Sequence, residues 1–222
     1  MTFLLLADVS PLEDSALYDA LYEGASLERR SVADSFRFRK DRNLSLGATA
    51  LLDRGLRAFG FYESDMSYGH TDKGKPFFLN APDIHFNISH SSSKVAVVLS
   101  DMEVGCDIEE VAEIDLAVAE RFFSPAEYEA IMQKEGPDVR LKEFFRYWTL
   151  KESYMKAIGM GMSLPPNSFT LSESAAGYEV FVGAPFDRGF AFKTPDSFKG
   201  YECAICYRPG SGVPQVEHVM LG

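Results

Sequence analysis

Three short apolar segments follow one another near the middle of the chain, and they constrain its fold more than any other feature. Ile84, Phe86 and Ile88 alternate with polar residues, 94–99 is almost continuously apolar, and 104–109 forms the third segment. Alternation is typical of a half-buried strand, and a short continuous run is typical of a strand buried on both faces. Because only short polar turns separate the segments, we predict an antiparallel meander.

Helical patterns flank this predicted meander on both sides. The expected helices cover 12–23, 26–32, 39–59, 116–135 and 138–158. Further strands are expected near 3–9, 178–182, 189–193, 201–207 and 216–220. Ser124-Pro125-Ala126-Glu127 is a helix start signal, with serine at the cap and glutamate three residues on. We therefore predict an α+β fold with an N-terminal lobe of residues 1–105, a C-terminal lobe of residues 106–222 and a site in the cleft between them.

Composition narrows the classes of protein that this chain can belong to. Apolar residues make up 46% of the 222 residues, which suffices for a packed core and excludes wholesale disorder. The net charge of −11 argues against general nucleic-acid binding. No segment approaches the roughly 20 apolar residues of a membrane span, and the opening residues are too short for a signal peptide. Three cysteines make no disulfide framework, so we expect a cytoplasmic protein.

Positive charge gathers against this acidic trend in two places. One is Lys73-Gly74-Lys75, and the other is the cluster between residues 29 and 42, which contains Arg29, Arg30, Arg37, Arg39, Lys40 and Arg42. A local basic patch on an acidic protein suits a small polyanion better than a long polymer. For residues 29–42 the alternative, that basic side chains simply decorate a solvated helix, stays open.

Three carboxylates give the main functional signal. Asp107 and Glu109 are separated by one residue in a predicted strand, so both project from the same face. Glu152 lies on the apolar stripe of the second long helix, whose other members at helical spacing are Leu141, Phe145, Trp148 and Met155. An unpaired charge on a core-facing stripe would cost several kcal/mol. Each of these acids therefore needs a positively charged partner.

A divalent cation would explain the three acids together. Mg²⁺ takes oxygen ligands and usually binds a few carboxylates together with substrate phosphates. Two structural alternatives remain open at this point. Asp107 and Glu109 could form a solvent-exposed acidic edge, and Glu152 could pair with Lys156, four residues later on the same side of the helix.

Several stretches of the sequence, taken in order, resemble the surfactin-type 4′-phosphopantetheinyl transferases. They are Phe38-Arg39-Lys40-Asp41-Arg42, Gly74-Lys75-Pro76, Phe86-Asn87-Ile88-Ser89-His90-Ser91, Val104-Gly105-Cys106-Asp107-Ile108-Glu109, Phe122-Phe123-Ser124-Pro125-Ala126-Glu127, Trp148-Thr149-Leu150-Lys151-Glu152-Ser153-Tyr154-Met155-Lys156-Ala157 and Gly159-Met160-Gly161-Met162. The resemblance implies a monomeric, pseudo-twofold pair of α+β lobes with coenzyme A between them. It also implies transfer of 4′-phosphopantetheine from coenzyme A to a serine of an apo acyl or peptidyl carrier protein, releasing 3′,5′-ADP.

The resemblance further implies roles for single residues. Asp107, Glu109 and Glu152 match the Mg²⁺ ligands, and Lys156 matches a lysine beside the pyrophosphate. The positions that line the nucleotide of coenzyme A are matched by Lys40, Arg42, Lys73, Lys75, Asn87, Ser89 and His90. The nucleophile belongs to the carrier, so the chain needs only a base for its proton. Glu152, directly or through a water on the ion, is the expected base and Glu127 the second candidate, while Lys156 supports the leaving phosphate.

Two other functions fit the same residues. One is a coenzyme A- or nucleotide-binding module without catalysis, and the other is a Mg²⁺-dependent phosphohydrolase that needs no carrier protein. Carrier proteins are usually acidic, as this chain is, so the resemblance leads us to expect an apolar docking surface with a few local cations rather than long-range attraction. We expect that surface around Phe122, Phe123 and Met160-Gly161-Met162.

Overall fold

The fold is described from a computed structural model, which covers residues 1–174, 177–181 and 189–221. Its helices are α1 (Ser15–Gly24), α2 (Leu27–Ser35), α3 (Arg39–Arg57), α4 (Ala119–Phe122), α5 (Pro125–Met132) and α6 (Pro137–Ala157). Its strands are β1 (Thr2–Asp8), β2 (Tyr68–His70), β3 (Pro76–Phe78), β4 (His85–Ser91), β5 (Lys94–Ser100), β6 (Val104–Glu110), β7 (Thr170–Ser174), β8 (Gly177–Phe181), β9 (Ala191–Lys193), β10 (Tyr201–Tyr207) and β11 (Gln215–His218). None of the helices in these ranges is long and apolar enough to cross a membrane.

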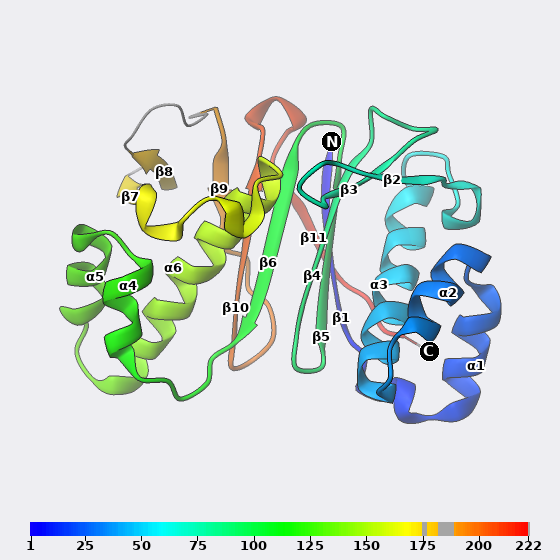
Figure 1. The fold of residues 1–222 in the computed structure, drawn as a ribbon, viewed down its shortest axis with the longest axis horizontal. Helices are drawn as coiled ribbons and strands as arrows, with labels where there is room; N and C mark the ends of the chain where they lie inside the picture. The colour runs from blue at the N-terminus through cyan, green and yellow to red at the C-terminus, as the bar shows by residue number, and fades with distance from the viewer. Residues whose placement is uncertain (175–176, 182–188, 222) are drawn as a thin grey trace.

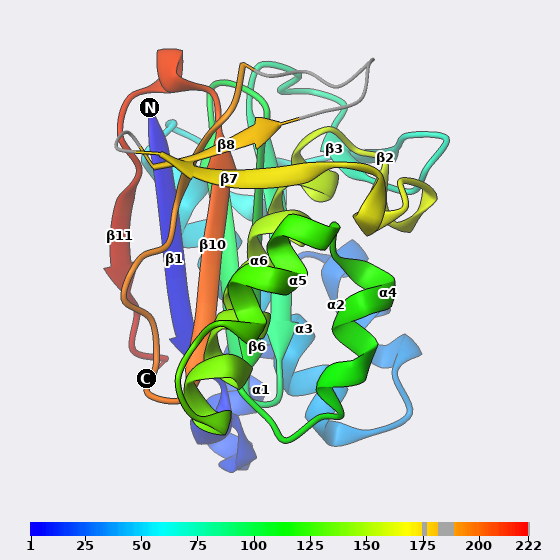
Figure 2. The same cartoon turned by 90° about the vertical axis from the view of Figure 1, so that its left-hand side faces the viewer.

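Two sheets lie at the centre of the molecule, with a helical layer on each outer side (Figure 1). The first sheet has the strand order β11-β1-β5-β4 and is covered by α1, α2 and α3. The second has the order β6-β10-β9 and is covered by α4, α5 and α6 (Figure 2). The hairpins β2–β3 and β7–β8 lie at one end of the strands. Each lobe thus pairs a sheet with a helical layer, which confirms the α+β class.

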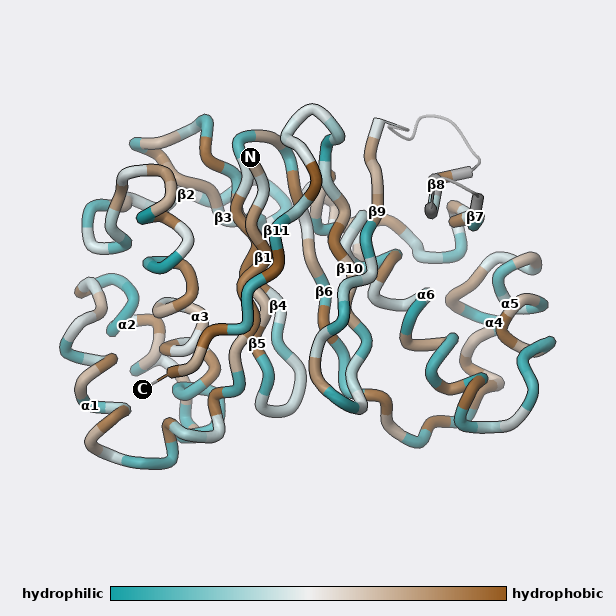
Figure 3. The backbone as a smooth tube through the Cα atoms, turned by 180° about the vertical axis from the view of Figure 1, so that it is seen from behind, coloured by the Kyte–Doolittle hydropathy of each residue, from teal (hydrophilic) through white to brown (hydrophobic). Residues whose placement is uncertain are grey.

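The first sheet is buried on both faces because helices cover one face and the second sheet covers the other. In β1, Leu5 belongs to the core under the helices, whereas Leu4 and Leu6 belong to the core between the sheets. In β5, Val97 and Val98 divide in the same way. Burial on both faces explains the almost continuous apolar runs in these strands, which form the hydrophobic centre of the backbone trace (Figure 3).

A glycine lets the longest C-terminal helix lie directly on the second sheet. A Cβ atom at Gly105 in β6 would overlap the carbonyl oxygen of Ser153 and the amide nitrogen of Ala157, both in α6. Only a residue without a side chain tolerates this approach of two backbones. The contact brings the C-terminal half of α6 beside the acidic residues of β6.

The two sheets meet along β4 and β6, which are joined through side chains rather than as neighbouring strands of one sheet. Asn87 of β4 accepts a hydrogen bond from the Cys106 amide at 2.9 Å. Ser91 accepts one from the Glu110 amide at 3.1 Å, and Ser89 lies between these two on the same face of the strand. This polar stripe links the N-terminal lobe to the C-terminal lobe.

The predicted meander is correct for two strands and wrong for the third. β4 and β5 form an antiparallel pair from His85 opposite Ser100 to Ser91 opposite Lys94, with Ser92 at a positive φ of 54° in the turn. β6 instead joins the other sheet, where it pairs antiparallel with β10. In a meander β6 would pair with the free edge of β5, but β1 occupies that edge from Thr2 opposite Ser100 to Asp8 opposite Lys94.

The predicted helix over 116–135 is divided, whereas that over 138–158 is confirmed as α6. Phe123 takes an extended conformation and ends α4. Ser124 then begins α5 with both hydrogen bonds of a capping box, one of them with Glu127. The predicted helix start at Ser124 is therefore confirmed. It begins a second helix and so divides the single helix that was predicted.

The end of the chain returns to the N-terminal lobe. β11 runs parallel to β1, and the Val219 amide donates a hydrogen bond to the Leu6 carbonyl at 2.8 Å. Leu221 packs in the core under α1–α3. The prediction that 106–222 form one lobe is thus wrong for this last stretch, and the boundary at residue 105 falls inside β6. Of the strand predicted at 178–182, residue 182 lies outside the described residues.

Candidate functional site

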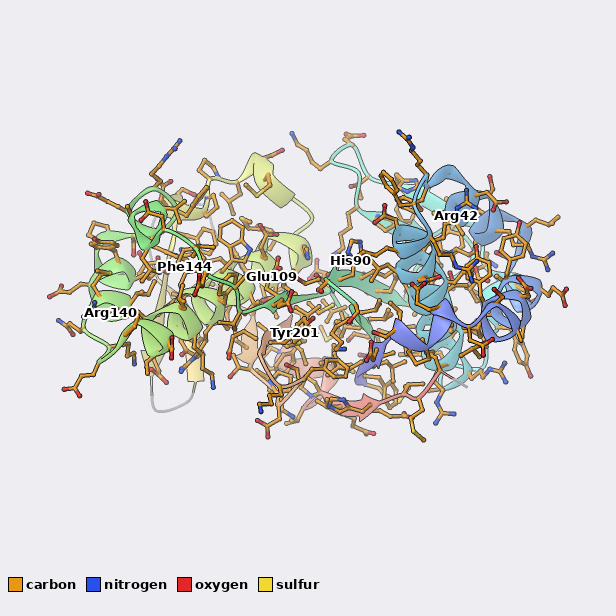
Figure 4. All side chains as sticks on the ribbon, turned by 90° about the horizontal axis from the view of Figure 1, so that it is seen from below. Arg42, His90, Glu109, Arg140, Phe144 and Tyr201 are labelled. Carbon is orange, nitrogen blue, oxygen red and sulfur yellow. The ribbon has the colours of Figure 1, made fainter. Side chains whose placement is uncertain are left out.

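The three predicted carboxylates line one pocket, where β4, β6 and α6 meet. The pocket has a volume of about 320 Å³. Its walls are formed by Ile88, Ser89, His90, Asp107, Glu109, Trp148, Glu152 and Lys156. Figure 4 shows His90 and Glu109 at the centre of the molecule, each reaching the pocket from a different lobe. Because β4 comes from one lobe and α6 from the other, the pocket opens between them.

Asp107 is the buried acid of the pocket, with 1% of its surface exposed. Its Oδ1 accepts hydrogen bonds from the Ser89 hydroxyl at 2.7 Å and from the Lys156 ammonium at 2.6 Å. Its Oδ2 is buried and has no hydrogen-bond partner among the described residues. Buried polar atoms are rarely left without a partner, so this oxygen is a candidate ligand for an ion or substrate.

Glu109 and Glu152 are partly buried beside Asp107. Burial raises the pKa of Glu109 above its ordinary value, the negative charge of Asp107 raises it further, and the Ser91 hydroxyl, which donates to it at 2.8 Å, counteracts part of the rise. Burial and the charge of Asp107 also raise the pKa of Glu152. Two glutamates whose ionisation is hindered by burial and by the charge of Asp107 make a site that favours a cation.

Lys156 is the basic residue of the pocket, and it does not form the pair with Glu152 that the sequence left open as an alternative. Its ammonium bonds instead to the Asp107 carboxylate at 2.6 Å and to the Ser89 hydroxyl at 3.0 Å. Burial acts to lower the pKa of Lys156, but the charge of Asp107 and their hydrogen bond outweigh it, so the pKa is raised. Lys156 therefore stays protonated at neutral pH.

The donor chemistry of the pocket suits Mg²⁺, which prefers carboxylate oxygens. The unpartnered Asp107 Oδ2 and the mutual repulsion of Asp107, Glu109 and Glu152 both fit such an ion. In the part of the chain that the structure describes, however, no three histidine, cysteine, aspartate or glutamate side chains are gathered closely enough to hold a metal ion. The structure thus brings the predicted ligands to one pocket but not to ligand distance.

A second cavity, of about 210 Å³, adjoins the first through Lys156. Its lining includes Lys73, Lys75 and Asn87. The ammonium of Lys75 donates to the Ala157 carbonyl at 2.8 Å and to that of Val104 at 3.2 Å, and burial lowers its pKa to about 8. Lys75 therefore links the β2–β3 turn to the C-terminal lobe, in addition to lining the cavity.

A third cavity, of about 160 Å³, shares Ile88 and His90 with the carboxylate pocket. The predicted nucleotide-binding residues Lys40 and Arg42 stand at the start of α3, and neither lines any of these three cavities. Arg42 donates to the Phe36 carbonyl at 2.8 Å. A larger cavity of about 710 Å³ lies between α6 and residues 194–202, and none of the predicted site residues lines it.

Glu127 requires a correction, because its carboxylate is fully engaged in the core of the C-terminal lobe. It is 1% exposed and forms an ion pair at 2.9 Å with Lys151, which is itself completely buried. It also accepts hydrogen bonds from the amides of Ser124 at 2.8 Å and Leu171 at 2.7 Å. Glu127 makes these contacts and does not line the carboxylate pocket, so the prediction of Glu127 as a second base is wrong.

Sequence reasoning also misplaced the buried face of α6. Trp148 and Glu152 are only partly buried and line the pocket, whereas the face that packs into the core carries Phe144, Leu150 and Lys151. Ser91, which bonds to Glu109, was not predicted as a site residue at all. The alternation of residues 87, 89 and 91 along β4 is the signal that could have identified it.

The chain is similar to several known proteins. The family model of the 4'-phosphopantetheinyl transferase superfamily matches residues 103–206. A 4'-phosphopantetheinyl transferase of Bacillus subtilis is 32% identical over 190 residues, which cover 85% of this chain and 84% of that protein. The 4'-phosphopantetheinyl transferase gsp of Aneurinibacillus migulanus is 32% identical over 207 residues, 93% of this chain and 86% of that protein. The solved holo-[acyl-carrier-protein] synthase of Thermotoga maritima aligns with a TM-score of 0.40 and 21% identity, over 48% of this chain and 62% of that one.

Proposed function

The chain belongs to the 4'-phosphopantetheinyl transferase superfamily, and from this premise we propose that its central pocket moves 4′-phosphopantetheine from coenzyme A to a serine of an apo acyl or peptidyl carrier protein. The serine oxygen bonds to the β-phosphorus of coenzyme A. The bond from that phosphorus to the bridging oxygen breaks, and 3′,5′-ADP leaves with the electron pair. The observation that carries this proposal is the set of three carboxylates around one pocket, with a buried Asp107 oxygen that lacks a partner.

Asp107, Glu109 and Glu152 are the residues that would hold Mg²⁺. They would have to lie closer together than they do here. The bound ion would supply positive charge to the diphosphate as negative charge develops on its oxygens. The free Oδ2 atom of Asp107 and the raised pKa values of the two glutamates support this assignment.

At the reacting atoms, Lys156 would stabilise negative charge and Glu152 would accept a proton. Lys156 is protonated and borders both the carboxylate pocket and the cavity of Lys73 and Lys75, so its ammonium can stabilise the charge on the departing phosphate. Glu152 lines the pocket and accepts protons more readily than an ordinary glutamate because its pKa is raised. It is therefore the base that we assign to the serine hydroxyl.

The nucleotide of coenzyme A is assigned to the side of the pocket that belongs to the N-terminal lobe. His90 and Lys73 line open cavities and can contact phosphates directly. Asn87, Ser89 and Lys75 already bond to the protein, so in this proposal they shape the site, and Lys40 and Arg42 would reach it from the start of α3.

We also propose a monomeric, cytoplasmic enzyme. One chain provides both walls of the pocket, β4 from the N-terminal lobe and α6 from the C-terminal lobe. A second subunit is therefore not needed to complete the site. Cys106 and Cys203 are buried free thiols, which suits a reducing compartment.

The test is to incubate the protein with coenzyme A, Mg²⁺ and a panel of apo acyl and peptidyl carrier proteins. Mass spectrometry should show one phosphopantetheinyl group on a carrier, with one 3′,5′-ADP released per modified serine. Chelation of Mg²⁺ should stop the reaction. Release of 3′,5′-ADP from coenzyme A without a carrier would instead indicate a phosphohydrolase, and coenzyme A binding without either product would indicate a binding module.

A further inference from the structure

Two serines of β4 bond directly to two of the three acids of the carboxylate pocket. The Ser89 hydroxyl donates to Asp107 Oδ1 at 2.7 Å, and the Ser91 hydroxyl donates to Glu109 Oε2 at 2.8 Å. Each serine comes from the first sheet and each acid from the second. The two pairs therefore repeat one contact between the lobes, two residues further along each strand.

Backbone amides of β6 fix the direction in which each hydroxyl donates. The Glu110 amide donates to the Ser91 oxygen at 3.1 Å, and the Ile108 amide donates to the Ser89 oxygen at 3.4 Å. The Lys156 ammonium also donates to the Ser89 oxygen, at 3.0 Å. A serine hydroxyl has a single hydrogen, whereas backbone amides and ammonium groups only donate. The hydrogen of each serine is therefore directed to its carboxylate.

Each hydroxyl ties the side chain of an acid to that acid's own strand. The amide that donates to the hydroxyl belongs to the residue directly after the acid, since Ile108 follows Asp107 and Glu110 follows Glu109. One serine oxygen from the opposite lobe thus joins the carboxylate to the backbone beside it. A glutamate side chain has several rotatable bonds, and a hydrogen bond to its ionised carboxylate is strong enough to restrict them.

At Asp107 these bonds leave one oxygen available to a ligand. Ser89 and Lys156 both bond to Oδ1, whereas Oδ2 is buried and has no partner among the described residues. Holding one oxygen of a carboxylate also sets the direction of the other. Groups that hydrogen-bond to metal ligands orient those ligands, and their loss commonly weakens metal binding.

We propose that Ser89 and Ser91 are positioning residues, which hold the carboxylates of Asp107 and Glu109 in the orientation that binds Mg²⁺. This inference rests on the proposed function. It adds a contribution of the N-terminal lobe to the ion site, since all three acids come from the C-terminal lobe. Ser91 allows the sharper test, because it does not line the carboxylate pocket and acts on the ion through Glu109.

The experiment measures the dissociation constant for Mg²⁺ by calorimetry, without coenzyme A or a carrier. Ser91→Ala should bind Mg²⁺ about tenfold or more weakly than the unaltered protein, and Ser91→Thr, which keeps a hydroxyl, should restore most of the affinity. Ser91→Cys, whose thiol is a weak donor, should also weaken binding, and it replaces Ser91→Ala if that variant does not fold. The matched control is Ser93→Ala, because the Ser93 hydroxyl accepts a hydrogen bond from Lys94, and here the Mg²⁺ affinity should not change.

A double-mutant cycle separates positioning from a merely structural role. Loss of the bond to the Glu110 amide should destabilise Ser91→Ala with or without Glu109, and urea unfolding measures this loss. The Mg²⁺ affinity should respond differently: in a Glu109→Ala background, Ser91→Ala should change it by less than about twofold.

Three results would overturn the inference. They are an unchanged Mg²⁺ affinity in folded Ser91→Ala, an equal loss of affinity in Ser93→Ala, and the same loss with and without Glu109. If the unaltered protein bound no Mg²⁺, both the ion of the proposed function and this inference would fail. If it bound Mg²⁺ as expected but modified no carrier, the proposed transfer would fail while the role of Ser91 stood.

Discussion

Asp107 has its two carboxylate oxygens in different situations. One oxygen accepts bonds from Ser89 and Lys156, and the other is buried without a partner. Glu109 and Glu152 add two more acids whose ionisation its charge opposes. In the absence of a bound ion this arrangement costs stability, because like charges in a partly dry pocket repel. The arrangement thus favours ligand binding and lowers the stability of the ligand-free protein.

Replacing Glu152 by glutamine tests this trade-off. We expect transfer to fall by about 100-fold or more, because both a ligand of the ion and the assigned base are lost. The stability of the metal-free protein should not fall, because one of the repelling charges is gone. Urea unfolding and single-turnover transfer measure the two effects, with Glu110→Gln, an exposed neighbour in β6, as the control. Normal turnover in Glu152→Gln would refute its role.

Stabilisation by Mg²⁺ should depend on pH. The folded-state pKa values of Glu109 and Glu152 lie above the ordinary value of 4.5. Below that pH both groups are protonated and the shift costs no stability. As the pH rises above the folded-state pKa values, their ionisation destabilises the folded protein by the full amount. Mg²⁺ binds the ionised groups and relieves the penalty. Thermal unfolding should therefore shift upward with Mg²⁺ by several degrees near pH 7.5 and by much less near pH 5. An equal shift at both pH values would contradict these ligands.

At the scale of secondary-structure elements, one buried ion pair fixes the position of α6. Lys151 follows Leu150 in the core and donates to the carbonyls of Phe169 at 2.6 Å and Pro166 at 2.8 Å, besides its pair with Glu127. These bonds tie α5, α6 and the start of β7 together. The neighbouring residue Glu152 is thereby held at the pocket.

Substituting glutamine for Glu127 should destabilise the protein by about 3–5 kcal/mol, because the ammonium of Lys151 would stay buried without its counter-charge. Urea unfolding measures the change. The matched control is Glu129→Gln on the same helix, where the carboxylate is exposed and accepts a hydrogen bond from Gln133 Nε2, so that the expected change is below about 0.5 kcal/mol. A loss of transfer in Glu127→Gln at unchanged stability would restore it as a candidate base.

Local signals in the sequence predicted the secondary-structure elements more accurately than they predicted which strands and side chains contact one another. The apolar run of β5 and the capping box at Ser124 depend on neighbouring residues, and both are confirmed. The departure of β6 to the other sheet depends on β1, from the start of the sequence, which pairs with β5 where a meander would place β6. Lys156 pairs with Asp107 rather than with Glu152, and this too depends on contacts between segments that are distant in the sequence. The carboxylates of the site were predictable, but their order of burial was not.

At the scale of the whole molecule, hydrogen bonds and a strand pairing connect the two lobes. The polar stripe of β4 bonds to β6, Lys75 reaches the carbonyl of Ala157, and β11 returns from the C-terminal half to pair with β1. The sheet of the N-terminal lobe is thus completed by a strand from the C-terminal half of the sequence. The cleft between them is therefore a fixed feature of one cooperative structure.

Thermal unfolding should consequently occur in a single transition. Calorimetric and van't Hoff enthalpies should agree, because separation of the lobes would break β11 from β1 and the β4–β6 contacts at once. Val216→Pro, which weakens the β11–β1 pairing, should lower the midpoint without splitting the transition. Two resolved transitions in the unaltered protein would show that the lobes unfold independently.

The parallel pairing of β1 with β11 also has a consequence for synthesis on the ribosome. β1 (Thr2–Asp8) emerges long before β11 (Gln215–His218), its partner on one side, because the two strands are far apart in the sequence. At about 5–20 residues per second, this edge of the nascent sheet stays open for roughly 10–40 s. An unpaired strand edge attracts other strands, so chaperones that shield it should raise the yield of native protein.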